Sequence, residues 1–570
     1  MRSKTIATLL FFLIILIAFV LRMSLLGVIP AGLTNDEADI GYDAYSILLT
    51  GKDQWGEFMP LTSFKGFGDY RLPLYTYLVV PMTAMFDLSA TSVRMPSAVF
   101  GVISVVLVYF LAKKLFQKYT YSNMVGIAAM LFMAISPWAV GLSRIGIESN
   151  VAITFFILGL FSFLHIKKGK KYLFLSFIFF SITLYVYTTY TFFTPASIII
   201  LWFFYRKDIS HIRKPFILGI LLFVLLIAPL FVLRSAAGVR VSQVSFINSA
   251  SSIGILSNLN ERRGSCNAVV PFQICKLFEN KPAVFTQTFI SNYLNHFSAS
   301  FLYINGTTTQ FSILPFRSLF YVFELIFLLS GLIGFLRLRV KSGLVLVVLL
   351  LTSVIPDAIT GDGHYSRASS MMLFMFLIEG FGVGYMWLAL ASFKKIRLSA
   401  AAILICIVAY FASSFVLSYF TFFPEYYSTY GQFGYEQLTE RMAEASKKYN
   451  DVYISKVSND TKQYIYYLFY TKYPPQKFQN KTYVSYTYDN GWVSIDTLDN
   501  IHYVDRLPSE AGIKKMKTNV MLITHPSELP KDYLFFDVVR NKKGDVQFGM
   551  TDSKSLLEYY ALHSSKNGEL

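Results

Sequence analysis

Residues 92–116 read SVRMPSAVFGVISVVLVYFLAKKLF, an apolar stretch with no charged side chain from Met95 to Ala112. A bilayer core about 30 Å thick takes about 20 helical residues, so this stretch predicts a membrane-spanning helix. The whole chain has the same character: of its 570 residues 54% are hydrophobic, 17% aromatic and only 15% charged, and the mean hydropathy is +0.48. This composition excludes a set of soluble domains, a disordered chain and a small disulfide scaffold. It favours a multi-pass α-helical membrane protein.

Working outward from this stretch, we predict eleven apolar spans. Two of them meet around Tyr185–Pro195, where we expect two separate helices and not one. We expect the first span to be retained rather than cleaved as a signal peptide, because no small-residue cleavage site follows it. The predicted spans lie near residues 5–26, 92–112, 123–140, 149–166, 172–189, 192–205, 216–234, 318–336, 342–356, 369–390 and 398–420.

The net charge of +17 belongs entirely to the first 420 residues, which hold 33 Lys and Arg against 16 Asp and Glu, whereas residues 421–570 hold 18 of each. The excess falls in short clusters between alternate spans: Arg2 and Lys4; Lys113, Lys114 and Lys118; Lys167, Lys168, Lys170 and Lys171; Arg206, Lys207, Arg213 and Lys214; Arg337, Arg339 and Lys341; Lys394, Lys395 and Arg397. The positive-inside rule produces this distribution. We therefore expect a protein of the cell membrane with a cytoplasmic N-terminus and no nucleic-acid partner.

The long polar segments then lie outside the cytoplasm, and they predict a membrane domain over 1–420 followed by an extracytoplasmic α/β domain over 421–570. The first outside loop is 27–91 and the longest is 235–317; two short turns lie at 141–148 and 357–368. In the last domain the runs DVYIS, YIYYLFY, NVMLITH and YLFFDVV are typical of strands, and the stretch 425–450 has helical spacing. The sequence FFDVVRNKKGDVQF predicts a hairpin that turns at Lys543-Gly544.

Two of the three cysteines, Cys266 and Cys275, lie nine positions apart in the long outside loop. They could form a disulfide in an oxidising compartment, or they could be two buried free thiols. Cys406 lies in a predicted helix.

The densest group of polar residues follows the first span, where Asp36 and Glu37 are adjacent. Two neighbouring carboxylates suit a general base or a metal ligand. The same residues also fit the first turn of a helix capped by Asn35. Both interpretations can hold together.

Several stretches resemble the protein O-mannosyltransferase and aminoarabinose-transferase superfamily, also called dolichyl-phosphate-mannose-protein mannosyltransferase-like, which comprises membrane glycosyltransferases of the GT-C type. They are TNDEADIGYDAYSILLTGKDQWGEFMP (34–60), DYRLPLYTYLVVP (69–81), the stretch 92–116, SPWAVGLSRIGIESN (136–150) and GHYSRASSMM (363–372). In that family an acidic pair follows the first helix, and an Arg-hydrophobic-Pro-Ser motif precedes the second span. The resemblance covers most of 1–420 and implies the GT-C fold. It also implies transfer of a sugar from a polyprenyl-phosphate donor to an acceptor on the outer side.

An inverting transfer of this kind needs a base for the acceptor proton and cations for the departing phosphate. We expect Asp36 to be the base, with Glu37 as its partner, an acceptor contact or a metal ligand. Glu148 could contact a metal or the acceptor, so a divalent metal cofactor stays open. The candidates for the donor phosphate are cations in the outside turns, each of which could instead anchor a lipid headgroup: Arg71, Arg144, His364 and Arg367.

Other functions fit some of these features. An oligosaccharide transferase or ligase with a lipid pyrophosphate donor would need a wider outside cavity. A polytopic transporter or flippase would hold charged side chains near the bilayer midplane, whereas here the polar groups gather outside. The acceptor of a glycosyltransferase with this layout could be a protein, a membrane lipid or a glycan. We expect His296, in the long loop, to be structural, and Trp55 and Trp138 to be interface anchors.

Overall fold

The computed structural model of the chain describes residues 2–68, 70–232, 253–306, 318–361, 363–430, 432–456, 462–481, 483–487, 493–516 and 518–566. Two compact units make up the chain. The first comprises Met1–Ser24, Tyr70–Tyr75 and Pro96–Ser418, and the second comprises Leu25–Asp69, Thr76–Met95 and Tyr419–Leu570. Apart from Tyr70–Tyr75, the loop predicted over 27–91 therefore belongs with the C-terminal residues, although more than 300 residues separate them in the chain.

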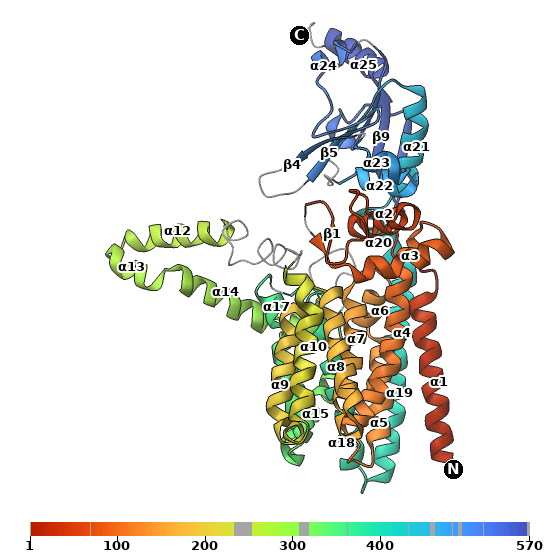
Figure 1. Ribbon diagram of the computed structural model, residues 1–570. Helices are drawn as coiled ribbons and strands as arrows, with labels where there is room; N and C mark the ends of the chain where they lie inside the picture. Colours follow the sequence, from red (N-terminus) through yellow and green to blue (C-terminus); the bar gives the residue numbers. More distant parts are fainter. Residues whose placement is uncertain are drawn as a thin grey trace. The chain divides into compact units, whose positions relative to one another are not determined.

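The first unit is a bundle of long helices that run side by side (Figure 1). Each of the eleven predicted spans falls on a helix or a helix pair. The elements are α1 (Arg2–Met23), α4 (Ala90–Leu115), α5 (Ser122–Ile135), α6 (Pro137–Ser143), α7 (Ser149–Phe163), η1 (Ile166–Lys168), α8 (Lys170–Val186), α9 (Tyr190–Ser210), α10 (Arg213–Val232), α15 (Glu324–Leu338), α16 (Lys341–Ser353), α17 (Ile355–Ala358), α18 (Ser369–Ala389) and α19 (Lys394–Leu417). The boundary around Tyr185–Pro195 is a turn between α8 and α9, as the sequence predicts.

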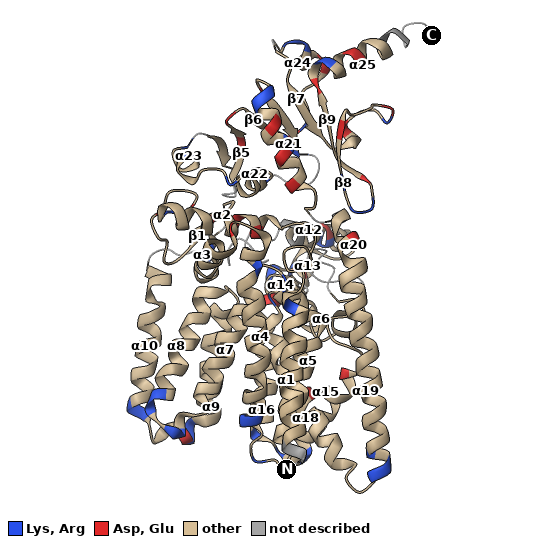
Figure 2. Ribbon diagram, turned by 90° about the vertical axis from the view of Figure 1, so that its right-hand side faces the viewer, with Lys and Arg blue, Asp and Glu red and all other residues tan. Residues whose placement is uncertain are grey.

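Within the described residues, six helices are long and apolar enough to cross a membrane singly, and the bent pair of α5 and α6 makes a seventh. Three further predicted spans, α7, α8 and α15, are helices of 15 to 17 residues. Lys and Arg gather at the end of the bundle that carries the N-terminus (Figure 2). The chain is a multi-pass membrane protein.

A buried arginine stabilises the break between α5 and α6, whose axes differ by 59°. Ser136 leaves the helical conformation because Pro137 follows it, and proline disfavours helix in the preceding residue. Arg22 of α1 donates hydrogen bonds of 2.9 Å to the carbonyls of Met133 and Ala134. A cation at these last carbonyls of α5 is favourable because they carry the negative end of the helix dipole.

Helix α18 is buried along most of its length and packs closely against α15. Glycines allow this approach: a Cβ atom at Gly382 would lie 1.9 Å from the carbonyl oxygen of Phe327, and one at Gly331 would lie 2.3 Å from that of Ile378. Close backbone contact through small residues is typical of helix packing in membranes.

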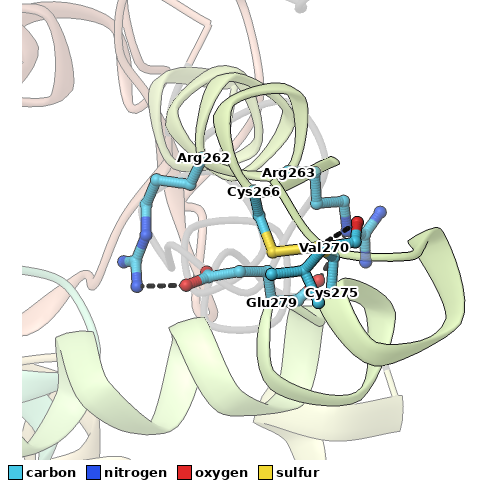
Figure 3. The surroundings of a disulfide bond; sticks show 6 residues. All are labelled: Arg262, Arg263, Cys266, Val270, Cys275 and Glu279. Atoms are coloured by element: carbon cyan, nitrogen blue, oxygen red, sulfur yellow. Dashed lines mark hydrogen bonds and ion pairs between the residues drawn. A yellow bond between two sulfur atoms is a disulfide. The ribbon is translucent and has the colours of Figure 1, made fainter. Parts of the chain in front are cut away.

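The described part of the long loop, residues 253–306, forms an arm of three helices, α12 (Ile253–Asn267), α13 (Phe272–Phe278) and α14 (Lys281–Asn295), followed by the π-helix η2 (Ser300–Ile304). A disulfide joins Cys266 to Cys275 and closes the end of the arm (Figure 3). Arg262 pairs with Glu279 at 2.8 Å beside this disulfide. The structure thus selects the disulfide over the two free thiols.

The second unit contains a seven-stranded mixed sheet with the order β4-β5-β6-β3-β7-β9-β8. Strand β3 is parallel to β6 and β7, and the other pairs are antiparallel. The strands are β3 (Val452–Ser455), β4 (Tyr483–Thr487), β5 (Val493–Leu498), β6 (Ile501–Val504), β7 (Met521–Thr524), β8 (Asp537–Arg540) and β9 (Val546–Asp552). The helices from the C-terminal part are α20 (Phe423–Tyr430), α21 (Tyr435–Lys448), α22 (Tyr464–Tyr470), α23 (Pro475–Gln479), α24 (Glu510–Lys514), η5 (Pro526–Glu528) and α25 (Ser553–Lys566).

The C-terminal α/β domain expected from the sequence is present, with two local corrections. The hairpin at Lys543-Gly544 is confirmed as β8 and β9. The run YIYYLFY is a helix, α22, and not a strand. Its first six residues are all buried, and a short apolar run of this kind has no periodicity that separates helix from strand. The stretch 425–450 is helical but breaks at Gly434, whose φ of 90° suits glycine.

The remaining elements come from the first outside loop and its continuation. They are α2 (Asn35–Thr50), β1 (Phe64–Lys65), β2 (Tyr70–Arg71) and α3 (Leu74–Phe86), and the π-helix η3 (Ser418–Phe422) follows α19.

Candidate active site

The N-terminus of α2 is held by a capping box. The hydroxyl of Thr34 accepts a 3.1 Å hydrogen bond from the backbone N–H of Glu37, and the Glu37 carboxylate accepts a 2.9 Å bond from the Thr34 N–H. The cap is therefore Thr34, and the sequence-based choice of Asn35 is wrong by one residue. The reciprocal pair satisfies two backbone donors that a helix start otherwise leaves without partners.

The Glu37 carboxylate is also buried against Arg94, at the start of α4. Their ion pair measures 2.8 Å, and the two side chains are at most 1% exposed. Arg94 also donates to the carbonyls of Leu26, Pro30 and Gly32, at 3.1, 3.0 and 2.5 Å. The guanidinium thus ties the loop before α2 to the helix itself. Breaking such a buried pair costs about 3–5 kcal/mol, because one charge is left uncompensated.

Asp36 differs from its neighbour in exposure. Its side chain is exposed in the first turn of α2, and its backbone N–H donates to the Asn35 side chain at 3.0 Å. The two carboxylates that the sequence could not distinguish therefore occupy different environments. Glu37 is fixed in a buried network, whereas Asp36 is presented to solvent.

A residue from the C-terminal part of the same unit also holds the start of α2. The side-chain oxygen of Gln432 accepts a 2.7 Å hydrogen bond from the Asn35 N–H and another from the Tyr466 hydroxyl. Tyr466 stacks on Tyr435, with ring centroids 4.1 Å apart. Gly32 has a φ of 81°, and a Cβ there would lie 3.0 Å from the Gln432 carbonyl oxygen. The backbone next to Asp36 is thus braced by the domain that follows the membrane helices.

Two more acids, Asp39 and Asp43, lie on the same face of α2 as Asp36 and are buried. Gln54 contacts both, with its amide nitrogen 2.5 Å from Asp39 and its backbone N–H 3.0 Å from Asp43. These acids are not among the site residues predicted from the sequence, although the i, i+3, i+7 spacing of Asp36, Asp39 and Asp43 indicates one helix face. Nearby, burial raises the pKa of Asp53 from 3.8 to about 6.

Among the phosphate candidates, Arg144 is fully buried in the first unit. Its terminal nitrogens donate to the carbonyls of Leu21 and Ser24, at 2.8 and 2.7 Å. These contacts place its charge at the C-terminal end of α1, where a cation is favourable. Glu148, the possible metal or acceptor contact, is half-buried at the N-cap of α7.

His364 and Arg367 come together in the turn before α18, and Asp357 organises this turn. The Asp357 carboxylate accepts bonds from the ring of His296 at 2.8 Å and from the His364 N–H at 2.6 Å. Arg367 donates to the Thr360 hydroxyl at 2.6 Å and stays 32% exposed. His296 is thus structural, as expected. Asp357 went unnoticed in the sequence because it follows an apolar span directly.

The last phosphate candidate, Arg71, is 3% exposed in β2 and belongs to the first unit. Trp138, expected at the membrane interface, is instead fully buried and donates to the Tyr365 carbonyl at 2.8 Å. Across the described residues, no group of three or more His, Cys, Asp or Glu side chains is arranged to hold a metal ion. The structure therefore brings together Asp36, Glu37 and Arg94 in one unit, and His364 and Arg367 in the other.

The fold of this chain is that of a known membrane enzyme. The crystal structure of ArnT from Cupriavidus metallidurans bound to undecaprenyl phosphate matches 96% of this chain and 98% of its own, with a TM-score of 0.52 and 11% identity. The crystal structure of the same protein in the apo state matches 98% of this chain and 99% of its own, with a TM-score of 0.53 and 10% identity. At such identity the likeness shows the fold alone. It is the GT-C fold that the sequence resemblance implies.

Residues 71–232 match the sequence model of the family described as dolichyl-phosphate-mannose-protein mannosyltransferase. This match begins at Arg71 and includes Arg94, Arg144 and Glu148. Among curated proteins, none matches the chain significantly.

Proposed function

We propose that the protein is an inverting glycosyltransferase that moves a sugar from a polyprenyl-phosphate donor to an acceptor on the outer side of the membrane. The observation that carries this proposal is the different environment of the two adjacent carboxylates, Asp36 and Glu37. Arg94 and Thr34 hold Glu37, and the helix that Glu37 anchors presents the exposed carboxylate of Asp36. The GT-C fold and the family match over residues 71–232 support the same reaction class.

In this reaction Asp36 takes the proton from an acceptor hydroxyl as the oxygen attacks the anomeric carbon. The bond from that carbon to the phosphate oxygen breaks, and the lipid phosphate leaves with the electron pair. An ionised phosphate needs no general acid, but nearby cations lower the energy of the charge that develops on it. A positioned general base contributes about 10² to 10⁴ in rate.

Arg71, Arg144, His364 and Arg367 are the cations proposed to serve the donor phosphate. The guanidinium of Arg367 is the best placed of these to change partners, because it is about one third exposed and its contacts are the Thr360 hydroxyl and a carboxylate 3.8 Å away. Arg144 binds backbone carbonyls with both terminal nitrogens, so its contribution would be a fixed positive charge. Glu148 stays a candidate contact for the acceptor or a metal.

The donor class follows from the fold and from the ligand of its counterpart, since ArnT was crystallised with undecaprenyl phosphate. The basic clusters gather at the end of the bundle that carries the N-terminus (Figure 2), and by the positive-inside rule this supports a cytoplasmic N-terminus. The acceptor is then a protein, lipid or glycan outside the cytoplasm.

The test uses the purified full-length protein in detergent with polyprenyl-phosphate sugars and candidate acceptors. We expect mass spectrometry to find a glycosylated acceptor and the free polyprenyl phosphate in equal amounts. Transfer in detergent also separates an enzyme from a transporter, because transport needs a sealed compartment. Movement of the lipid-linked sugar across proteoliposomes, without transfer to any acceptor in detergent, would contradict the proposal.

A further inference from the structure

A basic cavity of about 650 Å³ lies in the first unit where α4, η1, α9 and the α15–α16 turn meet. It is distinct from every residue assigned to sugar transfer. Six cations line it: Lys114, Lys118, Lys167, Lys168, Arg339 and Lys341. Sites for small ligands are concave and combine apolar walls with a few convergent polar groups, and this cavity has that form.

The cations reach the cavity from three sequence clusters that span residues 114–341. The positive-inside rule explains why these loops are basic, but it does not require them to converge. Among the described residues, two other basic clusters, at 206–214 and 394–397, contribute no cation to the lining. The fold has therefore gathered some of the charge around one hollow.

Negative charge from the protein neutralises little of this group. Among the described residues, Asp208 of α9 is the one acid that lines the cavity, and it pairs with Lys167 at 2.9 Å. Lys114 donates to the Gln117 side chain at 3.2 Å, and Lys341 lies over the Tyr205 ring at 4.6 Å.

Three cations remain available to a ligand. Among the described residues, Lys118, Lys168 and Arg339 have neither a hydrogen bond nor an ion pair from their side chains. Lys118 follows α4, Lys168 ends η1 and Arg339 follows α15, so they approach the cavity from different sides. Arginine and lysine arranged in this way suit phosphate oxygens.

Part of the lining is apolar. Phe163, Leu164, Ile166, Leu338 and Val340 contribute to the same cavity. A ligand that carries an anionic group next to hydrocarbon would satisfy both kinds of wall, whereas a free anion would use the cations alone. Basic pockets between membrane helices bind lipid headgroups by this combination.

We propose that the basic cavity binds a phosphate group, supplied by the headgroup of an anionic phospholipid at the cytoplasmic surface. The site is independent of the proposed glycosyl transfer, because it uses none of those residues. Bound lipid would join the ends of α4, α9 and α15, which are separate in the chain.

Native mass spectrometry of the full-length protein tests this proposal, with phosphatidylglycerol and phosphatidylcholine as probes. The variant replaces the three available cations, as Lys118→Gln, Lys168→Gln and Arg339→Gln together. Its matched control removes three basic residues that do not line the cavity, as Lys170→Gln, Lys394→Gln and Lys395→Gln. Each basic residue near a membrane surface changes anionic-lipid binding about fivefold, so the triple variant should bind phosphatidylglycerol about a hundredfold more weakly.

We expect the wild type and the control to retain one phosphatidylglycerol in preference to phosphatidylcholine. Equal retention by the triple variant and the control would overturn the proposal. Each single substitution is measured as well, so that misfolding of the triple variant leaves the test intact.

A second arm separates the two sources of phosphate. Delipidated protein is heated with inorganic phosphate or with chloride at equal ionic strength. Suppose that phosphate stabilises the wild type but not the triple variant, and that the wild type retains no lipid selectively. This result would assign the cavity to a soluble phosphate compound instead of a lipid. If the triple variant keeps both the lipid retention and the stabilisation by phosphate, the cavity is not a phosphate site.

Discussion

The ion pair between Arg94 and Glu37 permits a quantitative prediction. Replacing Arg94 with Met keeps much of the side-chain volume but leaves the Glu37 carboxylate buried without its cation, and three backbone carbonyls lose a donor. Removal of one partner of a buried ion pair costs about 3–5 kcal/mol. We therefore expect Arg94→Met to lower the free energy of unfolding by about that amount.

The double variant Arg94→Met with Glu37→Gln separates this charge effect from lost packing. Gln at position 37 keeps an oxygen that can accept from the Thr34 N–H, and it removes the buried charge. The double variant should therefore be more stable than Arg94→Met alone, with a coupling energy of about 1–3 kcal/mol. The assay is chemical unfolding in detergent micelles, followed by tryptophan fluorescence. Purely additive losses from the two single variants would refute the reasoning.

Two further predictions concern the surroundings of Asp36. Gln432→Ala removes the acceptor for the Asn35 N–H and for the Tyr466 hydroxyl, so we expect the free energy of unfolding to fall by about 1–3 kcal/mol. We also expect a lower kcat for sugar transfer at an unchanged KM for the donor. A donor KM that rises at constant kcat would contradict a role of Gln432 in placing Asp36. Asp53→Asn concerns a carboxyl whose pKa burial raises to about 6, so ionisation above that pH destabilises the folded state relative to the unfolded state. The free energy of unfolding of the variant should exceed that of the wild type by up to about 3 kcal/mol at pH 8 and by almost nothing at pH 3.5, since a shift of two pKa units is worth about that much. Chemical unfolding at both pH values measures this difference. Equal differences at the two pH values would disprove the raised pKa of Asp53.

The membrane helices were predictable because a span of apolar residues fixes its own structure. No packing partner is needed to identify α4 or α10, since the bilayer demands a helix whose backbone hydrogen bonds are internal. The basic clusters then fix the parity of the spans. The same argument fails for YIYYLFY, where a short apolar run sits in a water-exposed domain and its helical state depends on burial against neighbours.

The acidic pair shows what the sequence could not supply. Asp36 and Glu37 are chemically alike, and the ion pair that holds Glu37 in the buried network comes from Arg94, 57 residues later. Gln432 is nearly 400 residues away from the helix start that it braces. Such tertiary partners leave no local pattern, whereas the spacing of Asp39 and Asp43 did offer a signal.

The C-terminal domain gave no resemblance from sequence, and the first outside loop was assigned to the membrane part. The structure groups that loop, apart from Tyr70–Tyr75, with residues 419–570 in one compact unit. Gln432 and Tyr466 show how the domain contributes, because their contacts end at the residue next to Asp36. The domain therefore has a direct physical route to influence sugar transfer.

The central claim is that Asp36 is the general base of sugar transfer. Single-turnover sugar transfer by the Asp36→Asn variant in detergent tests this claim most directly. The control is Asp505→Asn, which removes an 89% exposed carboxylate from the same unit. We predict that Asp36→Asn slows transfer by about 10² to 10⁴ with donor binding preserved, and that the control transfers at the wild-type rate. A wild-type rate in Asp36→Asn would contradict the proposed mechanism.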